Sequence, residues 1–167
     1  METREQILSK VKKYLMEVLE PSRPELFGLP ACPFIKAERI KNNIMYEILS
    51  DGQSLTDLIK SFVKSDYTTA VIVQLFPDDD PLPASEVFEY QMFVNGLIKD
   101  AGIEGYKCIC ISPDQKLDIK GFSPRSLAPY FLINIGEQEE FDRTHNLVTR
   151  TRYFENFSDE YKTKLNY

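Results

Sequence analysis

The chain has 167 residues, a formal charge of −6 at pH 7 and 43% hydrophobic residues. This length suits one domain whose core needs neither disulfides nor a structural metal. The acidic balance argues against nucleic acid or an anionic membrane as a partner, and no apolar run approaches the ~20 residues that span a bilayer. We therefore expect a cytoplasmic protein whose partner is an unknown small molecule or another protein.

The first half of the sequence predicts two helices and two strands. Apolar residues recur at helical spacing over residues 3–20, and Pro21 ends that helix. The short apolar run 44–49 predicts a strand. Ser54 caps the next helix, and residues 68–76 then predict a strand that is covered on both faces, because nearly all of them are apolar or β-branched.

The second half predicts two more helices and two more strands. Ser85 is expected to cap a helix that runs to Asp100, and Tyr106–Ile111 follows as the third strand. The fourth strand is predicted over residues 130–135. A polar helix with weak periodicity is predicted over residues 138–157.

Together these elements predict an α/β (or α+β) domain over residues 1–157 and a frayed C-terminal tail over 158–167. Their order is α-β-α-β-α-β-β-α, with about four helices packed on a small mixed sheet of about four strands. The first three strands alternate with helices, which favours right-handed parallel crossovers. The direction of the fourth strand stays open, and an antiparallel place at an edge or beside the third strand is one solution.

The sharpest local feature is the sequence Cys32-Pro33-Phe34. A proline after a loop often occupies the first turn of a helix, which would put Cys32 where backbone N–H groups and the helix dipole stabilise a thiolate. Lys36 and Arg39 add positive charge in this interpretation. The alternative is that Cys32 is a small buried apolar residue, as free cysteines usually are.

The other side chains that could react or bind a metal are predicted to have structural roles. Cys108 and Cys110 lie two apart on a predicted strand, so both face one side. A metal site with Cys32 is a poor match, because paired ligands usually have two to four residues between them. His145 is the only histidine and lies on a polar helix. No nucleotide-binding, metal-binding or nucleophile motif appears, so no cofactor and no metal are predicted.

A longer pattern surrounds the cysteine. Residues 28–37 (GLPACPFIKA) resemble the Cys-Pro-Phe-Ala-Lys-Ala signature of an uncharacterised bacterial family, domain of unknown function family 1415. The resemblance continues in Ile111-Ser112-Pro113 and in Ala128-Pro129-Tyr130, which precedes the fourth strand. It implies that Cys32 shares one pocket with Arg125, Tyr130 and Asn134, and that Pro33, Phe34 and Lys36 belong to the binding region.

This sequence also departs from the family pattern. The family has histidines where Ser112 and Asn134 stand here, and its arginine before the Pro-Tyr element corresponds to Leu127, with Arg125 close by. We therefore expect a small binding or interaction domain without catalysis. The alternative is a thiol-dependent enzyme or redox protein that uses Cys32 at a helix N-terminus.

Overall fold

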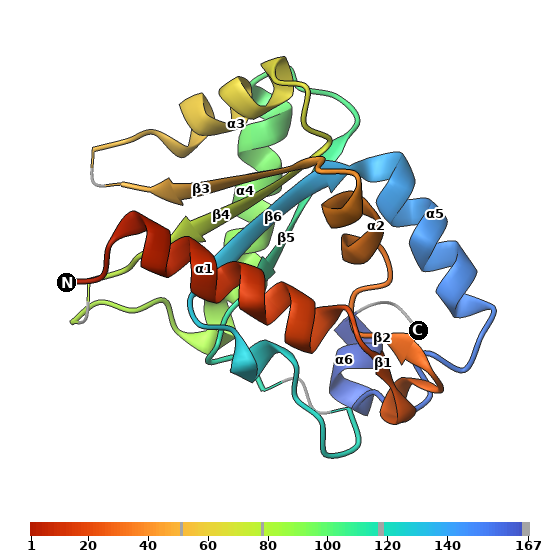
Figure 1. Cartoon of the computed structure of the whole chain (residues 1–167). Coiled ribbons are helices and arrows are strands. Elements are labelled where there is room, and N and C mark those ends of the chain that lie inside the picture. Colours follow the sequence, from red (N-terminus) through yellow and green to blue (C-terminus); the bar gives the residue numbers. More distant parts are fainter. Residues whose placement is uncertain (51, 78, 117–118, 165–167) are drawn as a thin grey trace.

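A computed structural model describes residues 1–50, 52–77, 79–116 and 119–164 (Figure 1). Its α-helices are α1 (Arg4–Tyr14), α2 (Ile35–Ile40), α3 (Leu55–Lys64), α4 (Val87–Asp100), α5 (Gln138–Thr149) and α6 (Asp159–Lys164). Its strands are β1 (Ser22–Arg23), β2 (Leu29–Pro30), β3 (Ile44–Leu49), β4 (Thr69–Gln74), β5 (Tyr106–Ile111) and β6 (Phe131–Glu137). One π-helical turn and three 3-10 turns complete the description: η1 (Leu15–Leu19), η2 (Pro24–Leu26), η3 (Ala84–Glu86) and η4 (Arg125–Leu127).

The main sheet has the strand order β3-β4-β6-β5, and β1 pairs with β2 in a small antiparallel ribbon. Strands β3 and β4 are parallel, whereas β6 is antiparallel to both of its neighbours, β4 and β5. The predicted mixed α/β architecture is therefore confirmed. The first three strands of this sheet run in the same direction. The fourth is antiparallel and lies beside the third, as one of the two predicted alternatives had it, and it is inserted between the second and third strands rather than placed at an edge.

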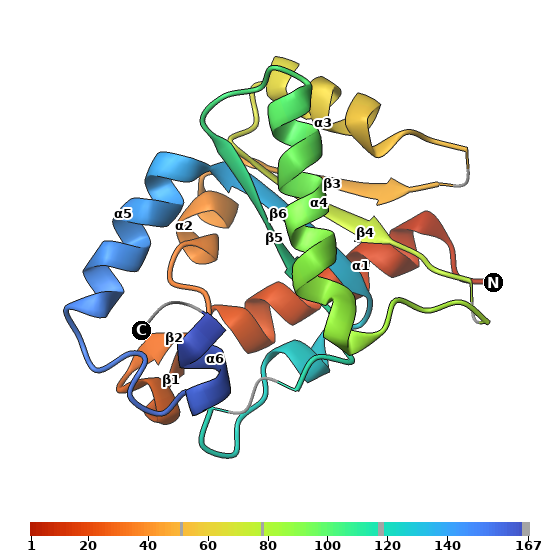
Figure 2. The same cartoon turned by 180° about the vertical axis from the view of Figure 1, so that it is seen from behind.

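Helices cover both faces of this sheet. Figure 1 shows α1 across one face, and Figure 2 shows α3 and α4 on the other. Because side chains alternate along a strand, each face has its own core: Val71 and Leu132 pack with α1, and Ile72 and Ile133 pack with α3 and α4. The strand β4 has five buried residues in succession, as its apolar sequence predicts.

The first helix is confirmed, with a change of geometry near its end. Thr3 and Gln6 form a capping box at its start, where each side chain accepts a hydrogen bond from the other residue's backbone N–H. The backbone widens to a π-helix over Leu15–Leu19, in which Glu20 N–H donates to Leu15 O at 3.0 Å. No helix in the described part of the chain is long and apolar enough to cross a membrane.

Three predicted boundaries were wrong. Ser85 lies in a 3-10 turn, and Glu86 occupies the N-cap position of α4. Helix α5 ends at Thr149 rather than at residue 157, because the following segment turns back and buries Tyr153 and Phe157 against other parts of the chain. Residues 159–164 of the predicted frayed tail form α6, and residues 165–167 lie outside the described part of the chain.

Candidate functional site

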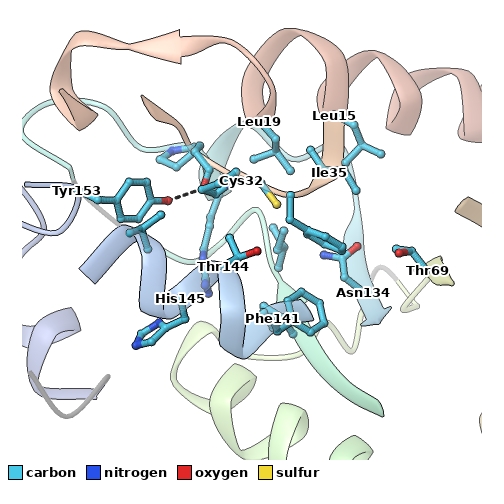
Figure 3. Close-up of a pocket in the computed structure, with 18 of the residues that line it drawn as sticks. Leu15, Leu19, Cys32, Ile35, Thr69, Asn134, Phe141, Thr144, His145 and Tyr153 are labelled. Carbon is cyan, nitrogen blue, oxygen red and sulfur yellow. Dashed lines mark hydrogen bonds between the residues drawn. The ribbon is translucent and has the colours of Figure 1, made fainter. Parts of the chain in front are cut away.

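A cavity of about 220 Å³ lies between the α1 face of the sheet, the loop before α2, helix α5 and the C-terminal segment. We call it the Cys32 cavity. Figure 3 shows the Cys32 sulfur and the Thr144 hydroxyl directed toward the same space, with Asn134 and Phe141 at its border. Its lining is mostly apolar and includes Leu15, Leu19, Ile35, Ile109, Ile111, Phe34, Phe141, Val148, Tyr14, Tyr153, Phe154 and Tyr161.

Asn134 places an amide in this apolar lining. It lies in the middle of β6, opposite Val71 on β4 and Ile109 on β5, and shares a face with the buried Leu132. Its Oδ1 is buried and has no hydrogen-bond partner among the described residues. Because buried polar atoms in proteins nearly always have a partner, this oxygen is a place for a hydrogen-bond donor that the fold itself does not supply.

Two hydrogen bonds hold the loop that carries Cys32, one at Cys32 itself and one at Ala31. Cys32 N–H donates to Leu19 O at 3.0 Å, at the end of the π-helical turn. The hydroxyl of Tyr153 donates to Ala31 O at 2.6 Å, which ties the C-terminal segment to the loop (Figure 3). The N-cap of α2 is Phe34 and not Cys32, because the helix begins at Ile35. The prediction that Cys32 begins this helix was wrong by two residues.

The electrostatic setting of Cys32 differs from the predicted positive field. Burial raises the pKa of its thiol, and the nearby charge of Glu20 raises it further, whereas the backbone N–H groups of Phe34 and Ile35 lower it by less. Arg39 does not supply free positive charge, because its Nε and Nη2 bind the Glu20 carboxylate at 2.5 and 2.8 Å. Lys36 is exposed and does not line the cavity.

We therefore expect Cys32 to react slowly with iodoacetamide near pH 7 and to be half-ionised above the ordinary value of about 8.5. Peptide mapping by mass spectrometry gives the rate at each pH, with the chain in urea as the reference. Because the folded state holds the proton more tightly, the thiol's contribution to stability is fully present below about pH 8.5 and is lost as the pH rises through the higher pKa of the folded state. A reaction rate that is already maximal at pH 7 would contradict this expectation.

Arg125 borders the Cys32 cavity at η4 and also lines a neighbouring cavity of about 330 Å³. Its Nη1 donates to the Gln115 Oε1 at 2.8 Å and, more weakly, to Cys110 O at 3.5 Å. Its Nη2 donates to the Tyr161 hydroxyl at 3.1 Å, and the guanidinium also faces the Tyr161 ring, 5.5 Å from its centroid. All of these partners are neutral.

The structure brings five of the seven predicted site residues to the Cys32 cavity: Cys32, Pro33, Phe34, Arg125 and Asn134. It leaves Lys36 and Tyr130 outside. The hydroxyl of Tyr130 donates to Glu2 Oε2 at 2.5 Å on another part of the surface. The pocket that the family resemblance implies for Tyr130 is therefore not the one that holds Cys32.

The other two cysteines lie on the opposite side of the sheet. Cys108 and Cys110 belong to the core under α3 and α4, with their sulfurs 3.6 Å apart. Cys32 belongs to the core on the α1 side, so the three thiols do not converge. Within the described ranges, no group of three or more His, Cys, Asp or Glu side chains is arranged to hold a metal ion.

Comparisons with known proteins found no relative of this chain. No protein-family model matches the chain, and neither the search of curated proteins nor that of solved structures found a significant match. The resemblance to domain of unknown function family 1415 therefore stays a prediction.

Sequence reasoning did not find Tyr14, Phe141, Thr144 and Tyr153, which also line the cavity. Thr144 and Phe141 lie on a polar helix with weak periodicity, which gives no sign that one face of it borders a cavity. The hydroxyl of Tyr14 donates to Pro124 O at 2.9 Å across 110 residues. Such long-range contacts have no local sequence signal. His145 also borders the cavity, but its ring is turned away from Cys32 (Figure 3).

Proposed function

We propose that this chain is a binding domain for a small, mostly apolar molecule that occupies the Cys32 cavity and donates a hydrogen bond to Asn134. The observation that carries the proposal is the buried Oδ1 of Asn134, which has no partner among the described residues. An apolar side chain at this position would avoid the cost of burying an unpaired carbonyl oxygen. A ligand with one N–H or O–H group removes the same cost when it binds.

The size and lining of the cavity support a ligand of this kind. Ligand sites are typically apolar and contain a few polar groups that orient the bound molecule. A cavity of 150 Å³ holds benzene, so one of about 220 Å³ suits a molecule of roughly ten non-hydrogen atoms. Phe34 and Phe141, whose ring centroids are 4.9 Å apart, provide an aromatic wall.

The protonation of Cys32 favours binding over nucleophilic chemistry. A thiol must ionise to attack a substrate, and burial raises the pKa of this one. In this proposal Cys32 is part of the apolar wall. All three cysteines are free, which supports the expectation of a cytoplasmic protein.

Binding of p-cresol tests the proposal, because this neutral molecule has an aromatic ring and one hydroxyl donor. We expect saturable amide shifts in ¹H–¹⁵N spectra that centre on Asn134, Thr144 and Cys32. The variant Thr144→Phe places a ring in the cavity, so we expect it to weaken binding more than about ten-fold. Thr149→Phe is the matched control, because Thr149 is exposed on the same helix, and it should leave binding unchanged.

Two outcomes contradict the proposed function. One is that p-cresol shifts residues scattered over the surface or produces no saturable shifts. The other is that Thr144→Phe binds p-cresol as the unmodified chain does. Either outcome removes the cavity as a ligand site.

A further inference from the structure

Arg125 is the only side chain in the described lining of the Cys32 cavity that carries a permanent charge. Aspartate, glutamate and lysine are missing from that lining. The side chain of Arg125 is itself partly buried, and no described carboxylate forms an ion pair with it. A partly buried cation without a counter-charge is costly, and an anionic group entering the cavity would supply the missing charge.

Among the described residues, the hydrogen bonds of Arg125 leave two of its five N–H donors unused. An arginine has five N–H donors, of which Nη1 uses two and Nη2 uses one in the contacts described above. The Nε–H and one Nη2–H therefore have no acceptor among the described residues. Arg39 uses the same two nitrogens, Nε and Nη2, to bind the carboxylate of Glu20 at 2.5 and 2.8 Å.

The charge of Arg125 acts on other side chains that line the Cys32 cavity. Tyr14 and Tyr153 both line the Cys32 cavity, and burial raises the pKa of each hydroxyl. The charge of Arg125 acts on both of them and lowers the pKa in part. The neighbouring larger cavity suits an anion less well, because Asp114 and Glu160 line it together with Lys116 and Arg125 and balance their positive charge.

We propose that the ligand of the Cys32 cavity is a small carboxylic acid, with its carboxylate bound by Arg125, its apolar body between the aromatic walls and a hydroxyl or N–H group at Asn134. This inference rests on the proposed function and specifies the ligand class. A planar carboxylate matches the free edge of a guanidinium. A phosphate group carries more charge and more acceptor atoms than one arginine in an apolar lining can satisfy.

Gln115 then acts as a positioning residue for Arg125. Its side chain is 8% exposed, and its Oε1 accepts hydrogen bonds from Arg125 Nη1 at 2.8 Å and from Ser112 N–H at 3.3 Å. These contacts hold one end of the guanidinium against the loop after β5. The Nε–H and one Nη2–H are left for the ligand.

The test compares 4-hydroxyphenylacetate with 4-hydroxyphenylacetamide by isothermal titration calorimetry. The two probes share the ring and the hydroxyl group and differ only in the charge of the head group. We expect the carboxylate to bind at least about ten-fold more tightly than the amide, as charge-assisted hydrogen bonds require. Arg125→Gln should abolish this preference, whereas Arg125→Lys keeps the charge and should keep part of it.

The control is Arg150→Gln, which makes the same change of charge at an exposed position after α5. We expect it to leave the affinity for both probes unchanged. A carboxylate that binds no more tightly than the amide overturns the inference, even if Arg125→Gln fails to fold, because that comparison uses the unmodified chain. A preference that survives in Arg125→Gln also overturns it.

The result with p-cresol separates the two proposals. If p-cresol binds in the cavity and the carboxylate has no advantage over the amide, the cavity is a ligand site and the role of Arg125 is wrong. If none of the three molecules binds, the proposed function fails together with this inference.

Discussion

Replacing Asn134 by leucine is expected to stabilise the folded chain by about 1–2 kcal/mol. Leucine has nearly the shape of asparagine, and at this place in β6 it removes a buried carbonyl oxygen that has no partner among the described residues. Most substitutions in a core destabilise a protein, so a gain in stability identifies a residue that the fold does not need. Urea unfolding at neutral pH measures the change.

Asn95→Leu is the matched control. Asn95 lies on α4, where its Oδ1 accepts from Cys108 N–H at 2.8 Å and its Nδ2 donates to Cys108 O at 3.2 Å. Leucine there leaves both backbone groups of Cys108 without this partner, so we expect a loss of about 2–3 kcal/mol. If Asn134→Leu is as destabilising as Asn95→Leu, then Asn134 is satisfied in the folded chain and is not reserved for a ligand.

The same variant separates stability from binding. We expect Asn134→Leu to weaken the binding of p-cresol, which has a hydroxyl donor, and to leave the affinity for toluene unchanged. The difference arises because only the hydroxyl group uses Oδ1. Equal effects on the two molecules would assign Asn134 to the shape of the cavity and not to recognition.

Replacing Tyr153 by alanine is expected to destabilise the chain by about 3–5 kcal/mol. Tyr153 is 6% exposed and its ring packs against Phe154 and Phe157, with centroids 4.8 and 5.3 Å apart. Its hydroxyl also holds the loop before Cys32 through Ala31 O. Loss of this side chain therefore opens one wall of the Cys32 cavity, and p-cresol binding should be lost with it.

Two further variants separate the contribution of the Tyr153 hydroxyl from that of its ring and provide a control. Tyr153→Phe keeps the ring and removes only the hydrogen bond, so we expect a loss of about 1 kcal/mol. Leu147→Ala removes an exposed side chain of α5 and should change stability by less than about 0.5 kcal/mol. If Tyr153→Ala costs no more than Tyr153→Phe, the aromatic cluster does not support the cavity wall.

Local sequence patterns were sufficient to predict the four strands of the main sheet, but not the two-residue strands β1 and β2. The runs Ile44–Leu49 and Tyr106–Ile111 have the predicted bounds, because short apolar segments between turn residues leave few alternatives. The place of β6 was not predictable in this way. A strand with apolar residues on both faces fits the middle of a sheet as well as it fits a covered edge. The choice depends on partners in β4 that lie 57 to 67 residues away in the sequence.

The sequence predicted several of the residues at the candidate site, but not the protonation of its thiol. The motif around Cys32 and the resemblance around Arg125 and Asn134 point to side chains that the structure does bring to one cavity. The pKa of the thiol was not predictable, because it depends on burial and on the ion pair of Arg39 with Glu20. Those two residues are 19 positions apart and show no spacing that indicates a contact.

The insertion of β6 between β4 and β5 determines when the main sheet can form during translation. Among the described strands, β5 pairs only with β6, which begins at Phe131, 20 residues after β5 ends at Ile111. A nascent chain on the ribosome therefore exposes both edges of β5 until the β6 segment leaves the exit tunnel. Translation of the last third of the chain sets the earliest moment at which this sheet can close, and until then β5 is a surface that chaperones can bind.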